Sequence, residues 1–280
     1  MEKLSIFEQM QFSTTRIETQ DSEGKGYSGT GFFFNYRLAN GDVVPLIITN
    51  KHVVEKMSVG RVVMTQADKN GEPMLPSYTV AIDKFEKRWL FHPDPEVDLC
   101  AFPLMHIVNF AKSNGVDLYF KAFDETLIPN KETVNSLDAV EDIYMVGYPN
   151  GLWDAVNNKP IVRKGITATD VKYDYNGKKE FVIDAASFPG SSGSPIFICN
   201  SGGYSDKKGS FYIGKSRIIL LGVLYAGPQL TIAGDVKVVT IPTAKQIAVS
   251  VTDIPTNLGY AIKSNRILDF IPLINQKYNM

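Results

Sequence analysis

Cysteine and long apolar runs are scarce in this chain, and each scarcity excludes a class of protein. Only two cysteines occur in 280 residues, Cys100 and Cys199, each inside an apolar run, so we expect two buried thiols rather than a disulfide. No apolar run approaches the ~20 residues that a membrane-spanning helix needs. The N-terminus also lacks the apolar stretch and cleavage site of a signal peptide. We therefore expect a cytoplasmic protein without a membrane partner.

The chain also lacks an excess of charge of either sign. The 29 basic and 30 acidic residues give a formal net charge of -1. Without a basic excess or a polybasic cluster, neither nucleic acid nor an anionic membrane surface is an expected partner. Hydrophobic residues make up 44% of the chain and charged residues 21%, which is typical of a globular protein.

Short strands dominate the sequence pattern. Aromatic and β-branched residues gather in runs separated by turn residues, and Asn40-Gly41 between two such runs is a strong hairpin signal. The runs are 31–36, 43–49, 61–65, 78–82, 97–104, 143–148, 161–169, 181–185, 195–199, 218–225 and 236–241. This spacing predicts an all-β fold of barrels or a sandwich rather than alternating βα units.

Two segments are expected to be helical, and a polar stretch divides the chain. One is a short turn at 51–56; the other is the C-terminal run from Ser264, the expected N-cap, in which Pro272 limits the regularity. Residues 107–137 are polar and lack alternation, so we expect a connection between two strand-rich halves. The predicted units are an N-terminal barrel (1–110), a connection (111–138), a C-terminal barrel (139–263) and a C-terminal helix (264–280).

A glycine-flanked serine is the first candidate for chemistry. A serine hydroxyl needs a nearby base, and donors for a developing oxyanion, to act as a nucleophile. In the loop Pro189-Gly190-Ser191-Ser192-Gly193-Ser194-Pro195, glycines allow a tight turn between two apolar runs. Taken alone, a loop of this composition is more often a surface turn.

Three histidines are available as a base. His92 lies in a turn-like sequence where a solvated side chain is expected, and His106 is expected to be packed or at the surface. His52, which follows the apolar run 46–48, is therefore the candidate base. Asp98 is the candidate acid, with a solvated strand-end carboxylate as the alternative, because it begins an apolar run where an unpaired charge would be costly. The chain order His52, Asp98, Ser192 is one of the known orders of a catalytic triad.

Several motifs resemble those of bacterial trypsin-like peptidases. The similar segments are the histidine motif Thr49-Asn50-Lys51-His52-Val53, the aspartate strand 97–102 and the second-barrel turn Val146-Gly147-Tyr148-Pro149. The nucleophile region 184–195 and the segment 259–262 resemble the Deg/HtrA branch of that family. The resemblance runs from about residue 29 to residue 274, and no sequence remains for the PDZ domain that most members of this branch carry.

This resemblance implies a chymotrypsin-like fold of two six-stranded antiparallel β-barrels with a C-terminal helix, and an active site between the barrels. It implies a serine endopeptidase in which Ser192 attacks the scissile carbonyl, His52 is general base and then general acid, and Asp98 holds His52. The backbone N–H groups of Gly190 and Ser192 are the implied oxyanion hole. The implied partner is a protein or peptide substrate, with no cofactor and no metal.

Two positions of the nucleophile loop depart from the family's usual residues. Family members usually have Asn or Asp where Ser191 stands, and Gly where Ser194 stands, which puts the competence of the resting loop in doubt. In zymogen-type proteases the residue before the nucleophile is an acid that pairs with a newly cut N-terminus. Ser191 cannot supply that charge, so we predict no activation by N-terminal processing.

Substrate preference is predicted from the residues before the nucleophile. Trypsin's basic-residue pocket has an acid where Ala186 stands, so cleavage after Lys or Arg is not expected. Asp184 is expected to be structural, and no histidine follows His106 to bind a Glu or Gln side chain. A small or apolar P1 residue is the default. The expected pocket residues are Ala186, Ser187, Tyr225 and Gly227.

Two segments of the chain match nucleotide-binding patterns. Residues 209–216 satisfy the P-loop pattern and residues 24–29 fit the dinucleotide fingerprint, but each leads into a strand-like run rather than a helix. We expect a hairpin loop at residues 24–29 and a strand in the interior of residues 209–216. The rival function is a protease-fold protein that binds peptides or partners without turnover, because a triad intact in sequence need not be aligned in space.

Overall fold

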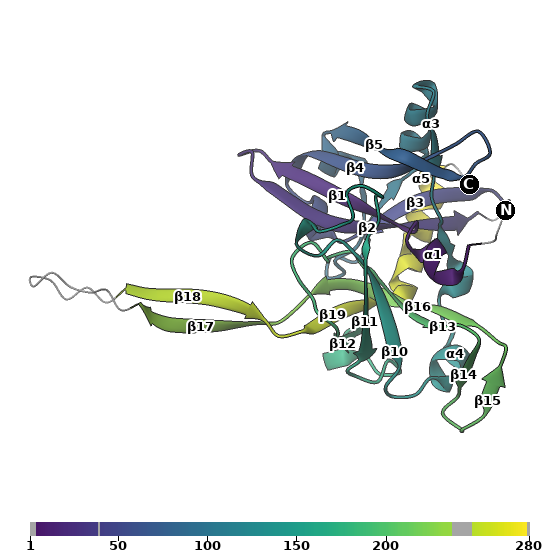
Figure 1. Cartoon of the computed structure of the whole chain (residues 1–280), viewed down its shortest axis with the longest axis vertical. Helices are drawn as coiled ribbons and strands as arrows, with labels where there is room; N and C mark the ends of the chain where they lie inside the picture. The colour runs from purple at the N-terminus through teal and green to yellow at the C-terminus, as the bar shows by residue number, and fades with distance from the viewer. Residues whose placement is uncertain (1–3, 39, 237–247, 279–280) are drawn as a thin grey trace, which may run out of the picture.

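Two β-sheets form the two halves of the molecule, which lie one above the other in Figure 1. The computed structural model describes residues 4–38, 40–236 and 248–278. None of the helices in those ranges is long and apolar enough to cross a membrane.

The N-terminal half is a nine-stranded sheet in the order β5-β4-β1-β2-β3-β7-β6, with β8 paired to β4 and β9 paired to β2. The predicted hairpin at Asn40-Gly41 joins β2 to β3, and Gly41 adopts the positive φ of +91° that favours glycine. The strands are β1 (Thr14–Asp21), β2 (Gly26–Arg37), β3 (Val43–Thr49), β4 (Met57–Ala67), β5 (Pro73–Asp83), β6 (Leu90–Phe91), β7 (Cys100–Pro103), β8 (Asp117–Tyr119) and β9 (Phe123–Asp124).

The C-terminal half is a closed barrel in the order β10-β11-β12-β19-β16-β13. Its strands are β10 (Asp142–Gly147), β11 (Ile161–Thr167), β12 (Glu180–Asp184), β13 (Pro195–Asn200), β16 (Arg217–Ala226) and β19 (Leu258–Lys263). Two hairpins extend from it: β14 (Gly203–Ser205) with β15 (Phe211–Ile213), and β17 (Gln229–Val236) with β18 (Ala248–Pro255). The second hairpin projects from the barrel as an arm (Figure 1).

Short helices connect and close the sheets. They are α1 (Ile6–Met10), α2 (Lys51–Val54), α3 (Met105–Ser113), α4 (Lys131–Ser136) and α5 (Ile271–Lys277), with 3-10 turns η1 (Phe85–Arg88), η2 (Glu125–Leu127), η3 (Pro149–Gly151), η4 (Tyr175–Gly177) and η5 (Ser264–Phe270). The C-terminal helix therefore begins as a 3-10 turn. Ser264, expected to be its N-cap, is instead its first residue and is buried. Pro272 lies in the first turn of α5, where its missing N–H needs no partner.

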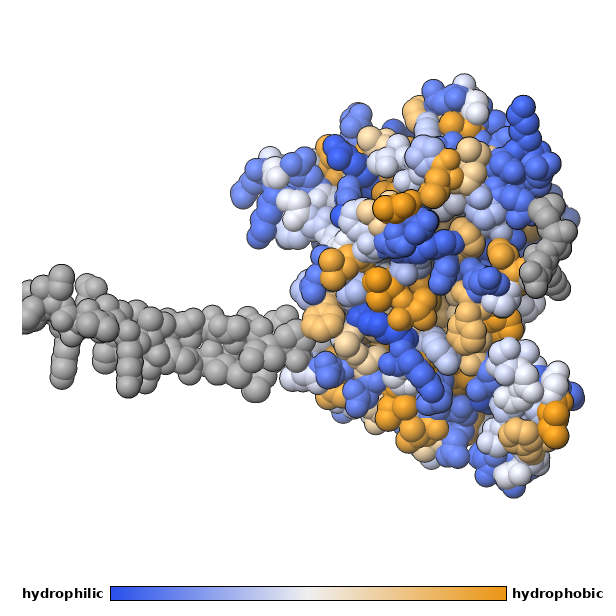
Figure 2. Space-filling model, in the orientation of Figure 1, coloured by the Kyte–Doolittle hydropathy of each residue, from blue (hydrophilic) through white to orange (hydrophobic). Residues whose placement is uncertain are grey.

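A shared core fixes the two halves against each other. Phe32 and Ile48 of the N-terminal sheet belong to the same buried cluster as Phe197 and Leu220 of the barrel. Phe123 of β9 packs on Phe197 with ring centroids 4.6 Å apart. On the face in Figure 2, apolar side chains are scattered among hydrophilic ones, as expected when most of the apolar surface is inside.

The predicted fold class is confirmed: the protein is all-β, with a closed six-stranded barrel, a second curled sheet and a C-terminal helix. The N-terminal sheet contains nine strands rather than six: seven form its main path, and β8 and β9 of the predicted connection add to it. The strand expected at 97–104 begins only at Cys100. Residues 24–29 lie in the β1–β2 hairpin, as expected, and the interior of the P-loop-like pattern, Phe211–Ile213, is the strand β15. Apart from Val236, the strand expected at 236–241 lies outside the described residues.

His92 is buried, in contrast to the solvated side chain expected from its turn-like sequence. Its Nδ1 accepts the backbone N–H of Asp94 at 3.0 Å, so Nε2 carries the proton. Nε2 lies 3.1 Å from the carbonyl oxygen of Arg266 and 3.2 Å from Oδ2 of Asp269. The C-terminal helix covers this turn, a contact between residues 174 positions apart that local sequence does not predict.

We expect acid to destabilise the fold through His92. Burial, the largest cause, and the nearby Arg266 lower the pKa of this imidazole below its ordinary value of 6.5. The unfolded chain therefore binds more protons than the native one just below that value, and stability is lost as pH falls through 6.5 towards the lower folded pKa. Denaturant midpoints measured from pH 7.5 to 5 should fall less in His92→Gln than in the wild type. Equal declines in both proteins would contradict this assignment.

Candidate active site

The structure brings together two of the three residues predicted for the triad, His52 and Asp98. His52 lies in α2, and its Nδ1–H donates to Oδ2 of Asp98 over 2.5 Å. The backbone N–H of His52 donates to the other carboxylate oxygen over 3.1 Å. One carboxylate thus fixes both the ring and the main chain of this histidine. Nε2 is left as the basic ring nitrogen.

Strand register explains why these two residues meet. β3 pairs with β7 antiparallel, with Thr49 opposite Cys100, so the end of β3 and the start of β7 lie at the same edge of the sheet. His52 follows that edge and Asp98 precedes it. Asn50 joins the two segments, because its side-chain amide donates to the carbonyl of Asp98 at 2.8 Å.

The nucleophile loop lies between β12 and β13 and is anchored on the N-terminal half. The backbone N–H of Thr30 donates to the Ser192 carbonyl at 2.8 Å, and the Thr30 hydroxyl donates to the Gly190 carbonyl at 2.9 Å. Gly193 has a φ of +87°, and a Cβ there would collide with the Thr30 carbonyl oxygen. Thr30 of β2 therefore holds the loop across the boundary between the two halves.

Two backbone N–H groups of this loop, those of Gly190 and Ser192, donate to no acceptor among the described residues. The Pro189 carbonyl accepts a backbone N–H from η3 at 2.6 Å, and because a trans peptide unit is planar, the N–H of Gly190 points the opposite way. The Ser191 carbonyl accepts the N–H of Ser194 at 2.9 Å, which turns the N–H of Ser192 away from it in the same manner. Both donors are therefore available to a bound acceptor.

Of the three serines in this loop, Ser192 alone reaches solvent. Ser191 and Ser194 are 0% exposed, whereas Ser192 is half-buried. Ser191 Oγ accepts a hydrogen bond from Arg163 at 2.9 Å. Ser194 Oγ is buried and has no hydrogen-bond partner among the described residues. Accessibility therefore favours Ser192 as the reactive hydroxyl.

The nucleophile loop and the His52 segment meet through β2 and β3. No hydrogen bond joins Ser192 Oγ to His52 in the described part of the chain. The two are linked indirectly, because Thr49 Oγ1, three residues before His52, donates to the Thr30 carbonyl at 2.6 Å. Catalytic hydrogen bonds are often long before substrate binds, so this geometry is compatible with a triad.

Neither cysteine can take the place of the serine. Cys100 and Cys199 are buried and form no disulfide, as expected from the sequence. Burial raises the pKa of Cys199 to about 11 and that of Cys100 well above its ordinary value. The thiolate, which is the reactive form, is therefore scarce at neutral pH.

The predicted pocket residues are brought together in part. A Cβ added to Gly227 would lie 3.4 Å from the Cβ of Ser187, so these two residues lie next to each other. Ala186 is half-buried beside Ser187. The hydroxyl of Tyr225, in contrast, donates to the carboxylate of Glu180 at 2.9 Å.

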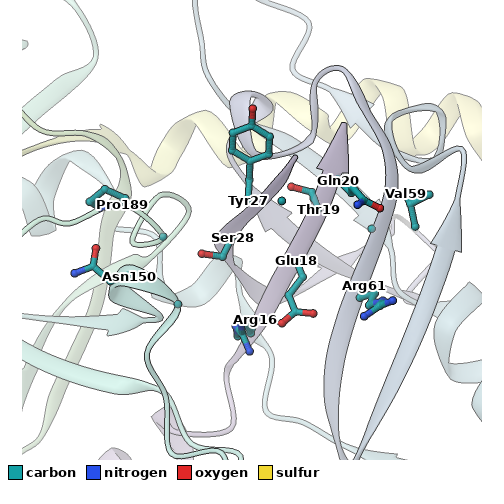
Figure 3. A pocket seen from close by; sticks show the side chains of 14 residues that line it. Arg16, Glu18, Thr19, Gln20, Tyr27, Ser28, Val59, Arg61, Asn150 and Pro189 are labelled. Atoms are coloured by element: carbon teal, nitrogen blue, oxygen red, sulfur yellow. Dashed lines mark ion pairs between the residues drawn. The ribbon is translucent and has the colours of Figure 1, made fainter. Parts of the chain in front are cut away.

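A groove of about 750 Å³ runs beside the nucleophile loop (Figure 3). Asn150 and Pro189 line one side and residues of β1, β2 and β4 line the other. Arg16 pairs with Glu18 at 2.7 Å and lies 3.6 Å from the centre of the Trp153 ring. The groove therefore has a polar, partly neutralised wall and is open to an extended chain.

Gly147 provides the space that Ser194 needs. A Cβ at Gly147 would collide with Ser194 Oγ and lie 2.7 Å from Thr30 Oγ1. Gly147→Ala is expected to destabilise the protein by about 1–3 kcal/mol in chemical denaturation, because the site is already filled. The further change Ser194→Gly should restore part of that loss, because the contact with Thr30 Oγ1 remains. Gly26→Ala, where the nearest atom is 4.0 Å away, is the control; an equal effect in both single variants would contradict the packing argument.

Two positioning residues were not identified from sequence. Thr30 stands between Gly29 and Gly31 at the start of an apolar run, and a polar residue flanked by glycines there is the signal that could have found it. Arg163, on β11, donates to both Ser191 Oγ and the Ala186 carbonyl. Its position depends on how β11 packs against the loop, which local sequence does not encode.

Comparison with known proteins finds similar solved structures and one matching family model. Solved structures similar to this chain include a protease of M. tuberculosis in its active form, with 15% identity, 92% of this chain and 78% of that chain covered, and a TM-score of 0.41. Others are GrC (12% identity, 99% and 98% covered, TM-score 0.47) and a cysteine-to-alanine mutant of tobacco etch virus protease (13% identity, 99% and 84% covered, TM-score 0.46). No curated protein matches the chain. The family model of the trypsin-like peptidase domain matches residues 29–203, which include His52, Asp98 and Ser192, and the chain belongs to that family.

Proposed function

We propose that this chain is a serine endopeptidase that hydrolyses peptide bonds through an acyl-enzyme on Ser192. Membership of the trypsin-like peptidase family supports a peptidase. The serine mechanism is supported above all by the hydrogen-bonded pair of His52 and Asp98, at 2.5 Å, in the half of the molecule to which the nucleophile loop is anchored. The burial of both cysteines supports serine over cysteine chemistry.

In the proposed reaction, Ser192 Oγ attacks the scissile carbonyl while Nε2 of His52 takes its proton. The imidazolium that forms is stabilised by Asp98 through Nδ1. The negative charge that develops on the carbonyl oxygen is stabilised by the N–H groups of Gly190 and Ser192. His52 then gives the proton to the leaving amine. In the second half of the reaction, His52 deprotonates a water molecule that attacks the acyl-enzyme, and the return of the proton to Ser192 Oγ releases the acid.

The residues around the nucleophile loop support a preference for certain substrates. The groove beside Pro189 and Gly190 accepts the chain on the leaving-group side of the scissile bond. Ser187 and Gly227, which lie next to each other, are the proposed contacts of a small or apolar P1 side chain, and the absence of a carboxylate at Ala186 argues against Lys or Arg there. The likeness of residues 184–195 to the Deg/HtrA branch favours a placement of this chain in that branch of the family.

A peptide-library cleavage profile tests the proposal. We expect cleavage after small or apolar residues and none after Lys or Arg, with all cleavage absent from a Ser192→Ala preparation purified in parallel. That control separates the activity of this chain from that of a contaminating peptidase. A folded wild-type protein that cleaves nothing would favour a peptide-binding module instead.

A further inference from the structure

Arg163 contacts the nucleophile loop from β11 and ties two of its residues together. Its Nη1 donates to the Ala186 carbonyl, and its Nη2 donates to Ser191 Oγ at 2.9 Å. These acceptors lie at the two ends of the segment that leads into Ser192. One guanidinium therefore spans the whole approach to the proposed nucleophile.

No carboxylate of the described residues balances the charge of Arg163. It forms no ion pair with any described residue, and its Nε is buried without a hydrogen-bond partner. Arg217 of the same barrel is arranged differently, because it pairs with Glu141 at 2.8 Å and with Asn200 at 2.9 Å. A partly buried cation without a counter-charge is costly to the fold. Its position therefore points to a role other than stability.

The residue that Arg163 fixes lies between the two proposed oxyanion donors. Ser191 separates Gly190 from Ser192 in the chain, and its N–H donates to the Phe188 carbonyl at 3.0 Å. The Ser191 carbonyl accepts another N–H of the loop. With Oγ held by Arg163, every polar group of Ser191 is bonded. The peptide unit that follows Ser191, which carries the N–H of Ser192, is therefore held in one orientation, whereas the N–H of Gly190 belongs to the peptide unit that Asn150 holds through the Pro189 carbonyl.

Within the described part of the chain, no other charged side chain bonds to Ser191. Zymogen-type relatives have an acid before the nucleophile and pair it with a newly cut N-terminus, but Ser191 carries no charge. We infer that Arg163 is a positioning residue that, by holding Ser191, keeps the N–H group of Ser192 turned towards the oxyanion, so that the loop is assembled without N-terminal processing. This inference rests on the proposed serine peptidase function. The charge of Arg163 also favours the negative charge that develops nearby.

Arg163→Met, which keeps the length of the side chain but removes its donors and charge, tests this role. We expect kcat to fall about 100-fold, the size of effect seen when one oxyanion donor is lost, while KM changes by less than about threefold. The rate of labelling by a fluorophosphonate should fall by a similar factor. Arg217→Met is the matched control: it removes an arginine of the same barrel that is paired with Glu141, and kcat should be unchanged.

Chemical rescue separates positioning from general damage. In Arg163→Ala, added ethylguanidinium should restore part of kcat, which a merely destabilised protein would not show. If Arg163→Met does not fold, Ser191→Ala decides, because it removes only the acceptor of Nη2; a fall in kcat of about tenfold is expected. A folded Arg163→Met or Ser191→Ala with wild-type kcat would overturn the inference and leave the proposed function intact. A wild-type protein that neither cleaves nor labels would overturn the proposed function itself.

Discussion

Replacing Ser192 with alanine is expected to lower kcat about a million-fold, the effect of removing a triad nucleophile. Its hydroxyl is the only one in the nucleophile loop that reaches solvent, and the same loop carries the N–H groups of Gly190 and Ser192, which donate to no acceptor among the described residues. KM should change little, because the groove and the pocket are left intact. The residual rate would come from substrate binding and the remaining oxyanion donors. Steady-state kinetics on a peptide identified from the library measures both constants.

Ser194→Ala is the matched control for that experiment. Ser194 is two residues from Ser192 but is completely buried, and its Oγ has no partner among the described residues. Alanine should therefore fit the same space, and kcat should remain within about threefold of the wild-type value. If Ser194→Ala abolished activity and Ser192→Ala did not, the assignment of Ser192 as the nucleophile would be wrong.

The second large effect is expected from Asp98→Asn, which should lower kcat about 10⁴-fold at neutral pH. Both carboxylate oxygens of Asp98 accept hydrogen bonds from His52, one from the backbone N–H and one from Nδ1. An asparagine that keeps its oxygen on the backbone N–H presents its NH₂ group to Nδ1. The imidazole must then carry its proton on Nε2, where it cannot accept the proton of Ser192. The measurement is kcat over a range of pH.

Asp184→Asn is the control for that variant, because Asp184 is an exposed carboxylate at the end of β12. Its kcat should stay close to that of the wild type. Structure determination of Asp98→Asn should show the His52 ring in place, since one hydrogen bond to the backbone N–H is kept. Full activity in Asp98→Asn would remove Asp98 from the mechanism, and a displaced ring would assign its effect to position rather than to the tautomer.

Local signals explain how much of the fold was predictable. Runs such as 43–49 and 195–199 combine β-branched residues with flanking turns, and both are strands in the structure. β8 and β9 were missed because they lie in a polar stretch, and they become strands by adding to β4 and β2. Pairing of this kind depends on which strand edges are open, a property of the assembled sheet.

The candidate site, like the fold, was predictable from the sequence only in part. The segments that carry His52 and Asp98 were found because each has a local pattern, and the structure joins the two side chains. Arg163 and Thr30 have no such pattern, since their importance lies in acceptors on the distant nucleophile loop. The doubt that Ser194 raised is answered in part by Gly147, which leaves room for its side chain. A sequence shows the reactive groups more readily than the residues that hold them.

The proposed mechanism is tested most directly by identifying the residue that a fluorophosphonate modifies in the folded wild-type protein. Peptide mapping by mass spectrometry after labelling gives that residue without any substitution. We predict one label per chain, on Ser192, with a rate that falls when His52 is replaced by alanine. Labelling of Ser191 or Ser194, or no labelling of a protein shown to be folded, would contradict the assignment of Ser192 as the nucleophile.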